Sequence, residues 1–411
     1  MSTPTKGALS HIRVLDLSRV LAGPWATQIL ADLGADVIKI ERPDAGDDTR
    51  GWGPPWMRDD EGKESSVAAY YLCTNRNKRS VTVDVACPEG QDLIRQLARE
   101  SDVLVENFKA GGLARYGLDF DSLHAVNPRL VYCSITGFGQ TGPYAARAGY
   151  DFLIQGLGGL MSVTGRPDGE PGGGPMKVGV ALTDILTGLY AANAIQAALA
   201  ARDRTGVGQH VDMALLDVQV ACLANQGMNY LATGNSPSRL GNAHPSIVPY
   251  QDFPTADGHM ILAIGNDGQF ARFCEETGRA ELAHNPRFAT NKARVEHRDE
   301  LIPILRELTG TRTTAQWVAA LEAKAVPCGP INTMAEVFDD PQVRARGLRI
   351  QMPHSETGTV PLVASPIRLS DTPVEYRLPP PMLGEHTASV LEDVLGLATE
   401  AVQALRERGV I

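Results

Sequence analysis

Apolar and polar residues alternate along the first half of the chain in the pattern of a parallel α/β fold. Short apolar strands alternate with amphipathic helices, and a strand, a helix and a second strand within about thirty residues form a βαβ unit. The predicted strands cover residues 11–17, 36–40, 80–85, 103–106 and 130–135, and the predicted helices cover 25–33, 90–100, 120–126 and 150–161. This alternation predicts a doubly wound α/β body with a mainly parallel sheet.

The first strand-to-helix turn carries no dinucleotide fingerprint. It reads LAGPWA (21–26), whereas dinucleotide-binding turns carry the pattern GxGxxG. The predicted fold is therefore Rossmann-like in its topology, but no dinucleotide cofactor is expected. A loop rich in Gly, Pro and charge follows over residues 43–66, and loops of that length are usually functional or mobile.

One uncharged run, Ile185–Ala201, is rich in Ala and Leu and predicts a buried helix. It is slightly short and small-sided for a membrane span. Asp184 directly precedes this run. Its ordinary interpretation is a helix cap. The alternative is a carboxylate that the helix N-terminus keeps ionised in an apolar setting, available as a nucleophile.

The pattern changes in the second half of the chain. A strand pair is predicted within 252–264 and a strand over 357–362, with helices over 267–278, 298–308, 314–324 and 383–396. We expect a large α/β domain over residues 1–225, a linker over 226–245 and a small α+β domain over 246–335. A C-terminal segment, 336–411, is expected to return to the large domain, because the apolar face of its last predicted helix must pack against something.

Composition narrows the possible partners. The 411 residues are 43% hydrophobic and 21% charged, with a net charge of −10 and no long basic run, which disfavours nucleic acid. Six scattered cysteines without a CxxC motif or a Cys/His cluster predict neither disulfides nor a metal site. The N-terminus lacks the apolar core of a signal peptide, so we expect a cytoplasmic protein that is not bound to a membrane.

Seven segments, in order along the chain, carry a resemblance to a known family. They are VLDLSRVLAGPWATQILADLGADVIKIERP (14–43), NRNKRSVTVDV (75–85), DVLVENFKAGGLARYGL (102–118), SITGFGQTGP (134–143), ALTDILTG (181–188), RTGVGQHVDMALLD (204–217) and PMLGEHT (381–387). Through them the chain resembles the class III CoA-transferases, the family of formyl-CoA transferase and of the carnitine-pathway and bile-acid-inducible transferases. GDDTRGWGPPW (46–56) and GNAHPSIVPYQ (241–251) resemble its dicarboxylate branch, which uses succinyl-CoA and glutarate.

The resemblance implies a CoA-transferase whose nucleophile is Asp184. In such an enzyme the carboxylate attacks the thioester of an acyl-CoA, such as succinyl-CoA, and forms a mixed anhydride. The released CoA thiolate returns to give an aspartyl-CoA thioester, and an acceptor acid then reverses the sequence. These intermediates need shielding from water. The resemblance also implies an interlocked homodimer, and no metal or cofactor beyond CoA itself as substrate.

Residues for CoA binding follow from the same resemblance. Val20, Leu21 and Ala22 match backbone that contacts the pantetheine and the reacting carbonyl. Leu21 stands where formyl-CoA transferase has a glutamine, which argues against formyl or oxalate specificity. Arg42 and Arg115 match residues that hold the adenine and phosphates of CoA; the alternative for each is a solvated surface arginine.

Tyr150 and Asp151 match a Tyr–Glu pair near the nucleophile, although Asp151 is alternatively the N-cap of its own helix. The family's α-methylacyl-CoA racemases carry a histidine base at the Tyr150 position. A phenol, whose unperturbed pKa is about 10, is a poor base at neutral pH. This difference favours a transferase. The alternatives are an acyl-CoA racemase or epimerase and a non-catalytic CoA-binding protein.

A dicarboxylic acceptor needs a cation for its second carboxylate, because burying that charge unpaired is costly. By location the candidates are Arg50, in the long loop, and Arg147, just before Tyr150. His244 stands where a glycine-rich loop closes over the intermediate in formyl-CoA transferase. Its alternative interpretation is an ordinary turn residue.

Overall fold

The computed structural model describes residues 7–411. They form two compact units. The first comprises the chain up to Gly159, Val178–Gly227 and Gln342–Ile411, and the second comprises Leu160–Lys177 and Met228–Pro341. Leu160–Lys177 were expected in the large domain but group with the second unit, which also includes residues 228–245 of the expected linker and 336–341 of the expected C-terminal segment.

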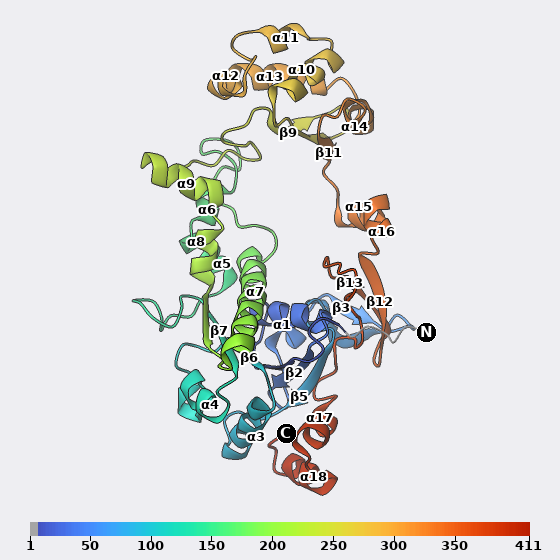
Figure 1. Cartoon of the computed structure of the whole chain (residues 1–411). Helices are drawn as coiled ribbons and strands as arrows, with labels where there is room; N and C mark the ends of the chain where they lie inside the picture. The colour runs from blue at the N-terminus through green and yellow to red at the C-terminus, as the bar shows by residue number, and fades with distance from the viewer. Residues whose placement is uncertain (1–6) are drawn as a thin grey trace. The chain divides into compact units, whose positions relative to one another are not determined.

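A six-stranded parallel sheet forms the centre of the first unit (Figure 1). Its strands lie in the order β5–β2–β1–β6–β7–β8. They are β1 (Arg13–Asp16), β2 (Asp36–Glu41), β5 (Lys78–Thr82), β6 (Val103–Glu106), β7 (Val131–Thr136) and β8 (His210–Ala214). Counted along the chain, this is the order 3-2-1-4-5-6 of doubly wound Rossmann-like sheets. The predicted fold class is confirmed.

Helices cover both faces of this sheet because successive strand side chains point to opposite sides. Val14 belongs to the apolar layer under α1 and α7, and its neighbour Leu15 belongs to the layer under α3, α4, α17 and α18. The helices of this unit are α1 (Ala22–Asp32), α2 (Ala69–Leu72), α3 (Pro88–Arg99), α4 (Phe120–Val126), α5 (Asp151–Leu157), α7 (Leu182–Thr205), α8 (Leu215–Ala221), α17 (Thr387–Leu395) and α18 (Thr399–Glu407).

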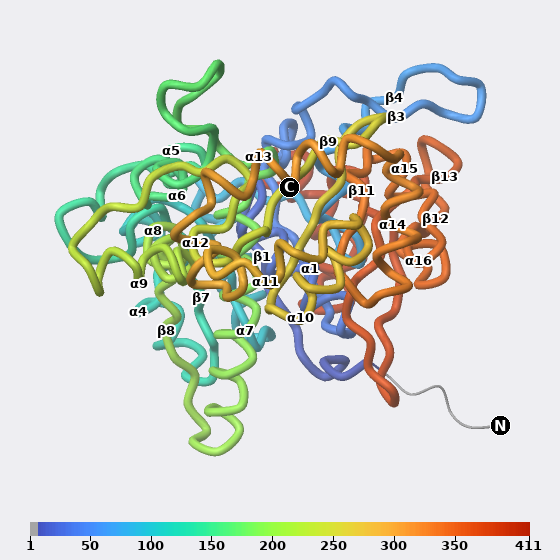
Figure 2. The backbone as a smooth tube through the Cα atoms, turned by 90° about the horizontal axis from the view of Figure 1, so that it is seen from above, coloured from blue at the N-terminus to red at the C-terminus, as the bar shows by residue number. Residues whose placement is uncertain are grey.

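Smaller elements complete the first unit. They are the strand pairs β3 (Trp56–Arg58) with β4 (Glu64–Ala68) and β12 (Arg349–His354) with β13 (Gly358–Val363), and the 3-10 helices η1 (Asp48–Gly51) and η2 (Ala114–Tyr116). Figure 2 shows β12 and β13 side by side from above. The C-terminal segment lies against β5, where Thr387 Oγ1 accepts the Thr82 N–H at 3.0 Å, and Ile411 is buried in the core.

The second unit is an antiparallel sheet, in the order β11–β10–β9, packed with short helices. Its elements are α6 (Leu160–Val163), β9 (Tyr250–Pro254), β10 (His259–Ala263), α10 (Asp267–Glu276), α11 (Glu281–His284), α12 (Asn291–Glu296), α13 (Arg298–Thr309), α14 (Thr314–Glu322), β11 (Cys328–Pro330) and α15 (Met334–Asp339). Connecting helices α9 (Ala224–Thr233) and α16 (Pro341–Ala345) carry the chain between the units. The core of the second unit contains the buried aromatic side chains of Phe253, Phe270, Phe273 and Trp317.

Most differences from the sequence expectation occur at the ends of elements. Helix α1 begins at Ala22, three residues before the expected start, because Pro24 in a first turn removes an N–H that has no helical partner. The single helix expected over 150–161 is two helices, α5 and α6, interrupted at Gly158 and Gly159. Gly159 has a φ of +83°, a left-handed conformation that a continuous helix cannot contain.

Candidate active site

Asp184 lies in the first turn of α7 but does not cap the helix. The N-cap is Ala181, which makes no side-chain cap bond. A carboxylate from another helix caps α7 instead: Asp151 Oδ1 accepts the Thr183 N–H at 2.8 Å and the Asp184 N–H at 3.3 Å. The interpretation of Asp184 as a helix cap is therefore wrong.

Asp151 is held in this position by buried amide side chains. Its Oδ2 accepts a hydrogen bond from Gln155 Nε2 at 2.7 Å, and Gln155 Oε1 accepts the Val178 N–H at 3.0 Å. On the other side, Thr183 Oγ1 donates to Gln219 Oε1 at 2.6 Å. The alternative that Asp151 is the N-cap of α5 is also wrong, because Tyr150 occupies that position. Asp151 caps the neighbouring helix and joins α5 to α7.

The Asp184 carboxyl group is partly buried and is not stabilised as an anion. Burial and, to a smaller extent, the charge of Asp151 together raise its pKa to about 7. Among the described residues, no donor forms a hydrogen bond with the Asp184 carboxylate oxygens. The expectation that the helix N-terminus keeps this group fully ionised is therefore wrong. Asp151 occupies the helix amides, and near pH 7 Asp184 is in balance between its acid and its carboxylate.

A glycine brings the start of α1 close to Asp184. Gly188 lies so near α1 that a Cβ there would be 2.7 Å from the Ala22 carbonyl oxygen and 3.0 Å from Trp25 Cβ. Residues four apart share one face of a helix, so Asp184 lies on the Gly188 side of α7. The first turn of α1, with Leu21 buried at its N-cap, thus packs against α7 at a residue one helical turn from Asp184.

The turn before α1 lies at the point where the strand order reverses. It follows β1, and the neighbouring strand β6 ends at Glu106, directly before Asn107, which forms hydrogen bonds with Arg19 in the turn. Open α/β sheets bind ligands in the crevice outside the carboxyl ends of the strands at such a switch point. Val20 in this turn has a φ of +72°, which is rare for a β-branched residue, and its N–H donates to Asp47. This geometry and the switch-point position make the turn a candidate binding site.

Two tyrosines lie in different surroundings near these groups. Tyr150 is 67% exposed at the N-cap of α5. Tyr70, in α2, is half-buried, and burial raises its pKa to about 12, with further contributions led by the charge of Asp184. Its ring meets Trp52 edge-on, with 5.2 Å between centroids. Sequence reasoning missed Tyr70, because nothing in the run AAYYLC distinguishes it from Tyr71.

The basic residues predicted for CoA are exposed. Arg42 Nη2 lies 3.5 Å from Asp48 Oδ1, and more than half of the Arg42 side chain is accessible. Arg115 is exposed in η2, with its guanidinium 4.5 Å from the Tyr116 ring centroid. Both guanidinium groups therefore have free donors for phosphate.

Arg50 is not a free cation. Its guanidinium donates to Glu41 Oε1 and Oε2 at 2.8 and 2.7 Å, to the Tyr71 hydroxyl at 2.6 Å and to the Pro381 carbonyl at 3.1 Å. It lines a cavity of about 220 Å³ between the long loop and the proline run. Because its charge is already paired, Arg50 is a poor candidate for holding a substrate carboxylate.

Arg147 and His244 lie in different units. Arg147 is exposed, with its guanidinium 4.5 Å from the Tyr144 ring centroid and 5.2 Å from that of Phe138. His244 belongs to the second unit, where its Nδ1 accepts the Ser246 N–H at 3.0 Å. That bond is typical of a turn residue. Of the two arginines predicted for the second carboxylate of an acceptor, Arg147 is therefore the one whose charge remains available.

Residues 7–411 contain no group of three or more His, Cys, Asp and Glu side chains arranged to hold a metal ion. Within the same residues, every helix is too short or too polar to cross a membrane.

A family model, named relatives and a solved structure to which the chain is similar all indicate the same family. The model of CoA-transferase family III matches residues 9–387. The chain is 57% identical to succinate–glutarate CoA-transferase of Agrobacterium fabrum, over 95% of this chain and 96% of the relative. It is 45% identical to succinyl-CoA:glutarate CoA-transferase of Homo sapiens, over 98% of this chain and 90% of the relative. The crystal structure of a CAIB/BAIF family protein from Brucella suis has a TM-score of 0.83 at 53% identity, covering 95% of this chain and all of that one.

The raised pKa of Asp184 predicts a pH-dependent stability. The folded protein binds this proton more tightly than the unfolded chain, so the ionised group destabilises the fold increasingly as the pH rises from about 4 to 7. Asp184→Asn removes this destabilising charge. Its stabilising effect, measured by urea unfolding, should grow by up to about 2 kcal/mol between pH 5 and pH 8.

The matched control is Asp203→Asn, which alters an exposed acid near the other end of α7. Its effect should not change in this way between pH 5 and pH 8. A stabilisation by Asp184→Asn that is equal at both pH values would show that the pKa is not raised.

Proposed function

The chain belongs to CoA-transferase family III, and we propose that it moves CoA from succinyl-CoA to glutarate or a similar dicarboxylic acid. The names of two relatives at 57% and 45% identity support this substrate pair. The observation that carries the proposal is the position of Asp184: a partly buried carboxyl group without a hydrogen-bond donor, one helical turn along α7 from the residue that packs against the first turn of α1.

The proposed reaction begins when the Asp184 carboxylate attacks the thioester carbonyl of succinyl-CoA. The carbon–sulfur bond breaks, CoA leaves as thiolate, and a succinyl–aspartyl anhydride remains. The thiolate then attacks the aspartyl carbonyl, which releases succinate and leaves an aspartyl-CoA thioester. Glutarate attacks this thioester, and the same two steps in reverse give glutaryl-CoA and free Asp184. No net proton is gained or lost.

The surroundings of Asp184 suit a nucleophile. A carboxylate with a pKa near 7 is more basic than an ordinary one, and nothing in the described structure ties up its lone pairs. The amides of Ala22 and Gly23, in the first turn of α1, have no acceptor within their helix. Such groups stabilise the oxyanion that forms when a thioester carbonyl is attacked.

CoA would lie along the carboxyl edge of the sheet. Arg42 and Arg115, with exposed guanidinium groups, suit its phosphates, and the turn at Val20–Ala22 suits the pantetheine end. A racemase would need a base at position 150, where the chain has an exposed tyrosine. That residue favours transfer over racemisation. The cytoplasmic location expected from the sequence stays a prediction.

Covalent trapping tests the role of Asp184. After incubation with succinyl-CoA, hydroxylamine should convert Asp184 to a hydroxamate that peptide mass spectrometry locates.

Asp184→Asn should lower kcat at least about 1,000-fold, because the covalent route is lost. In the wild type, kcat should fall as the pH drops below about 7, where the nucleophile becomes protonated. Full activity of Asp184→Asn would remove the proposal, and Asp203→Asn serves as the control.

We further propose that Arg147 holds the second carboxylate of the acceptor. Arg147→Gln should raise the KM for glutarate about tenfold or more and leave the KM for butyrate nearly unchanged, because only glutarate loses a charge-assisted bond. Arg129→Gln, at another exposed arginine of the first unit, should change neither value. Equal losses on both acids would show that Arg147 does not distinguish them.

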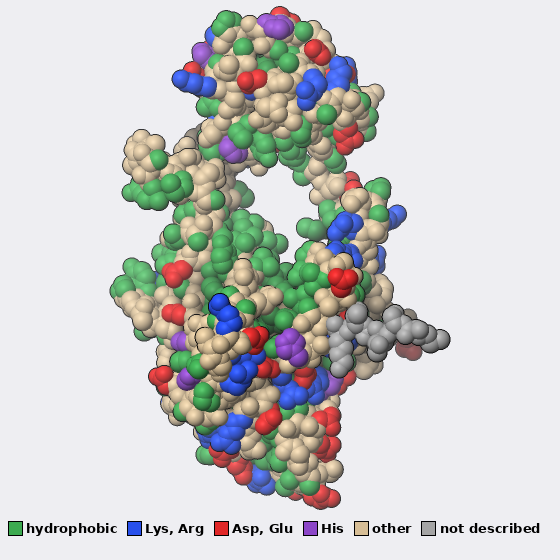
Figure 3. Space-filling view, viewed as in Figure 1, with side chains coloured by type: hydrophobic (Ala, Val, Ile, Leu, Met, Phe, Trp, Pro, Cys, Tyr) green, Lys and Arg blue, Asp and Glu red, His purple; other side chains and the backbone are tan. Residues whose placement is uncertain are grey.

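A homodimer is the proposed assembly. Large apolar side chains are exposed on α5, α7 and α8, and Figure 3 shows hydrophobic atoms gathered over these helices. They include Tyr150, Phe152, Leu153, Leu157, Leu189, Tyr190 and Val220. A monomer rarely leaves so many on adjoining elements, so a second copy of the chain is the proposed cover.

Sedimentation equilibrium should give twice the chain mass of 44.1 kDa. Leu189→Glu, on the exposed side of α7, should shift the protein toward monomer. Val363→Glu, at an equally exposed apolar residue of β13, should leave the mass unchanged. A monomeric wild type would contradict the dimer.

A further inference from the structure

We propose that Lys39, Asp47 and Asn107 are positioning residues of the transfer site, which hold the backbone of Ser18–Val20 in place beside α7. The inference deepens the proposed function, because the turn matters only if a thioester is attacked there. It rests on hydrogen bonds to three consecutive residues of one turn, on the left-handed conformation of Val20 and on a fully buried ion pair.

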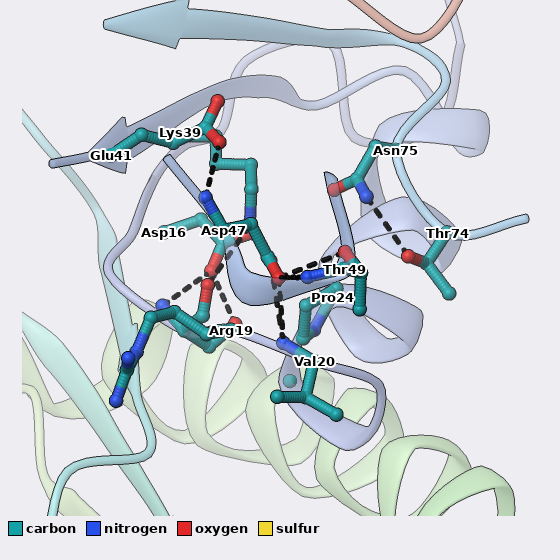
Figure 4. Close-up of polar contacts among 12 residues, drawn as sticks. Asp16, Arg19, Val20, Pro24, Lys39, Glu41, Asp47, Thr49, Thr74 and Asn75 are labelled. Carbon is teal, nitrogen blue, oxygen red and sulfur yellow. Dashed lines mark hydrogen bonds and ion pairs between the residues drawn. The ribbon is translucent and has the colours of Figure 1, made fainter. Parts of the chain in front are cut away.

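An ion pair holds the two ends of this turn. Lys39 Nζ donates to the Ser18 carbonyl oxygen at 2.9 Å and to Asp47 Oδ2 at 2.9 Å. Asp47 in turn accepts the Val20 N–H, with 3.2 Å to Oδ1 and 3.3 Å to Oδ2. Figure 4 shows Asp47 between Lys39, Val20 and Thr49. One buried pair therefore binds the carbonyl at the start of the turn and the amide at its end.

A neutral side chain holds the middle of the turn. Asn107 Oδ1 accepts the Arg19 N–H at 2.9 Å, and Asn107 Nδ2 donates to the Arg19 carbonyl oxygen at 2.7 Å. Asp16 Oδ1 accepts the Ser18 N–H at 2.9 Å. Every backbone polar group from the Ser18 N–H to the Val20 N–H thus has a side-chain partner.

The bonds explain how Val20 keeps its conformation. A non-glycine residue in the left-handed region is strained and persists only where the surrounding structure over-determines it. Val20 is β-branched, which makes a φ of +72° less favourable still. Glycine would adopt this φ without penalty but would not hold it, because glycine also populates many other conformations.

The charges of the pair persist at neutral pH. Lys39 and Asp47 are both fully buried, and the attraction of opposite charges, together with hydrogen bonds, outweighs the cost of burial. These interactions lower the pKa of Asp47 to about 2 and raise the pKa of Lys39. A buried ion pair seldom adds net stability over an apolar pair of equal volume. Geometry is the better explanation, since these two charges fix backbone groups that apolar side chains cannot bind.

The consequence for the reaction follows from the position of the turn. It continues directly into Leu21 and Ala22, and the Ala22 carbonyl meets α7 at Gly188. A displacement of about 1 Å between a nucleophile and its target can cost about a hundredfold in rate. Loosening the turn should therefore slow the attack by Asp184 much more than it weakens CoA binding, because the contacts proposed between the CoA phosphates and exposed arginines remain.

The test compares kcat with the dissociation constant of CoA in single variants. Asp47→Ala and Asn107→Ala should each lower kcat at least about tenfold, and the dissociation constant of CoA should change less than about threefold. Asp47→Asn keeps an acceptor for the Val20 N–H and should lose less activity than Asp47→Ala. The pH midpoint of kcat should stay at the wild-type value, because Asp184 is unchanged.

The matched control is Asp32→Asn. Asp32 is a buried carboxylate at the far end of α1, paired with Arg76 and bonded to Asn77, and it makes no contact with the turn. Its loss should lower the melting temperature but leave kcat within about twofold of wild type. Asn107 is only half-buried, so Asn107→Ala carries the test if Asp47→Ala does not fold.

The failure of this inference is distinguishable from failure of the proposed function. If the wild type transfers CoA, and Asn107→Ala and the folded Asp47 variants retain the kcat of Asp32→Asn, the positioning role is overturned. If the wild type transfers no CoA between any pair of acids, the proposed function is overturned first, and the inference, which rests on it, falls with it.

Discussion

The close contact of α1 and α7 is the constraint on which the active site depends. It requires a residue without a side chain at 188, because any Cβ would collide with the backbone of Ala22. Through this contact the first turn of a helix that follows β1 lies beside the first turn of a helix about 160 residues later in the chain. The proposed nucleophile and the turn proposed to bind its substrate are therefore positioned by one packing interface rather than by local sequence.

Electrostatics in this unit separates two kinds of buried charge. Around the turn, Lys39 and Asp47 are fully buried but paired, so both stay ionised. At α7 the two carboxyl groups differ: Asp151 receives the helix amides, and Asp184 receives none to its side chain and has a raised pKa. The fold thus stabilises the charges of Lys39, Asp47 and Asp151 and leaves the Asp184 carboxylate poorly stabilised. Such a raised pKa is what a nucleophilic carboxylate at neutral pH requires.

Much of the fold could be predicted from the sequence, because helix and strand periodicity is local information. The bounds expected for β6 and α4 agree with the structure, and those of β2 differ by one residue. The site was less predictable. From its place in the sequence, Arg50 is a candidate for binding a substrate carboxylate. In the structure, its guanidinium already donates hydrogen bonds to Glu41 and Tyr71. Tyr70 has no sequence signal, because its surroundings come from the carboxyl groups of other elements.

The sequence by itself determined the alternation of strands and helices, the apolar helix after Asp184 and the family. Each of these depends on the order and type of residues that are neighbours along the chain. Only the tertiary structure decided that Asp184 does not cap its helix. Its partner Asp151 is thirty-three residues away and takes the cap that local reasoning assigned to Asp184. Burial, like-charge repulsion and competition for the same helix amides depend on distances in space, which no local pattern encodes.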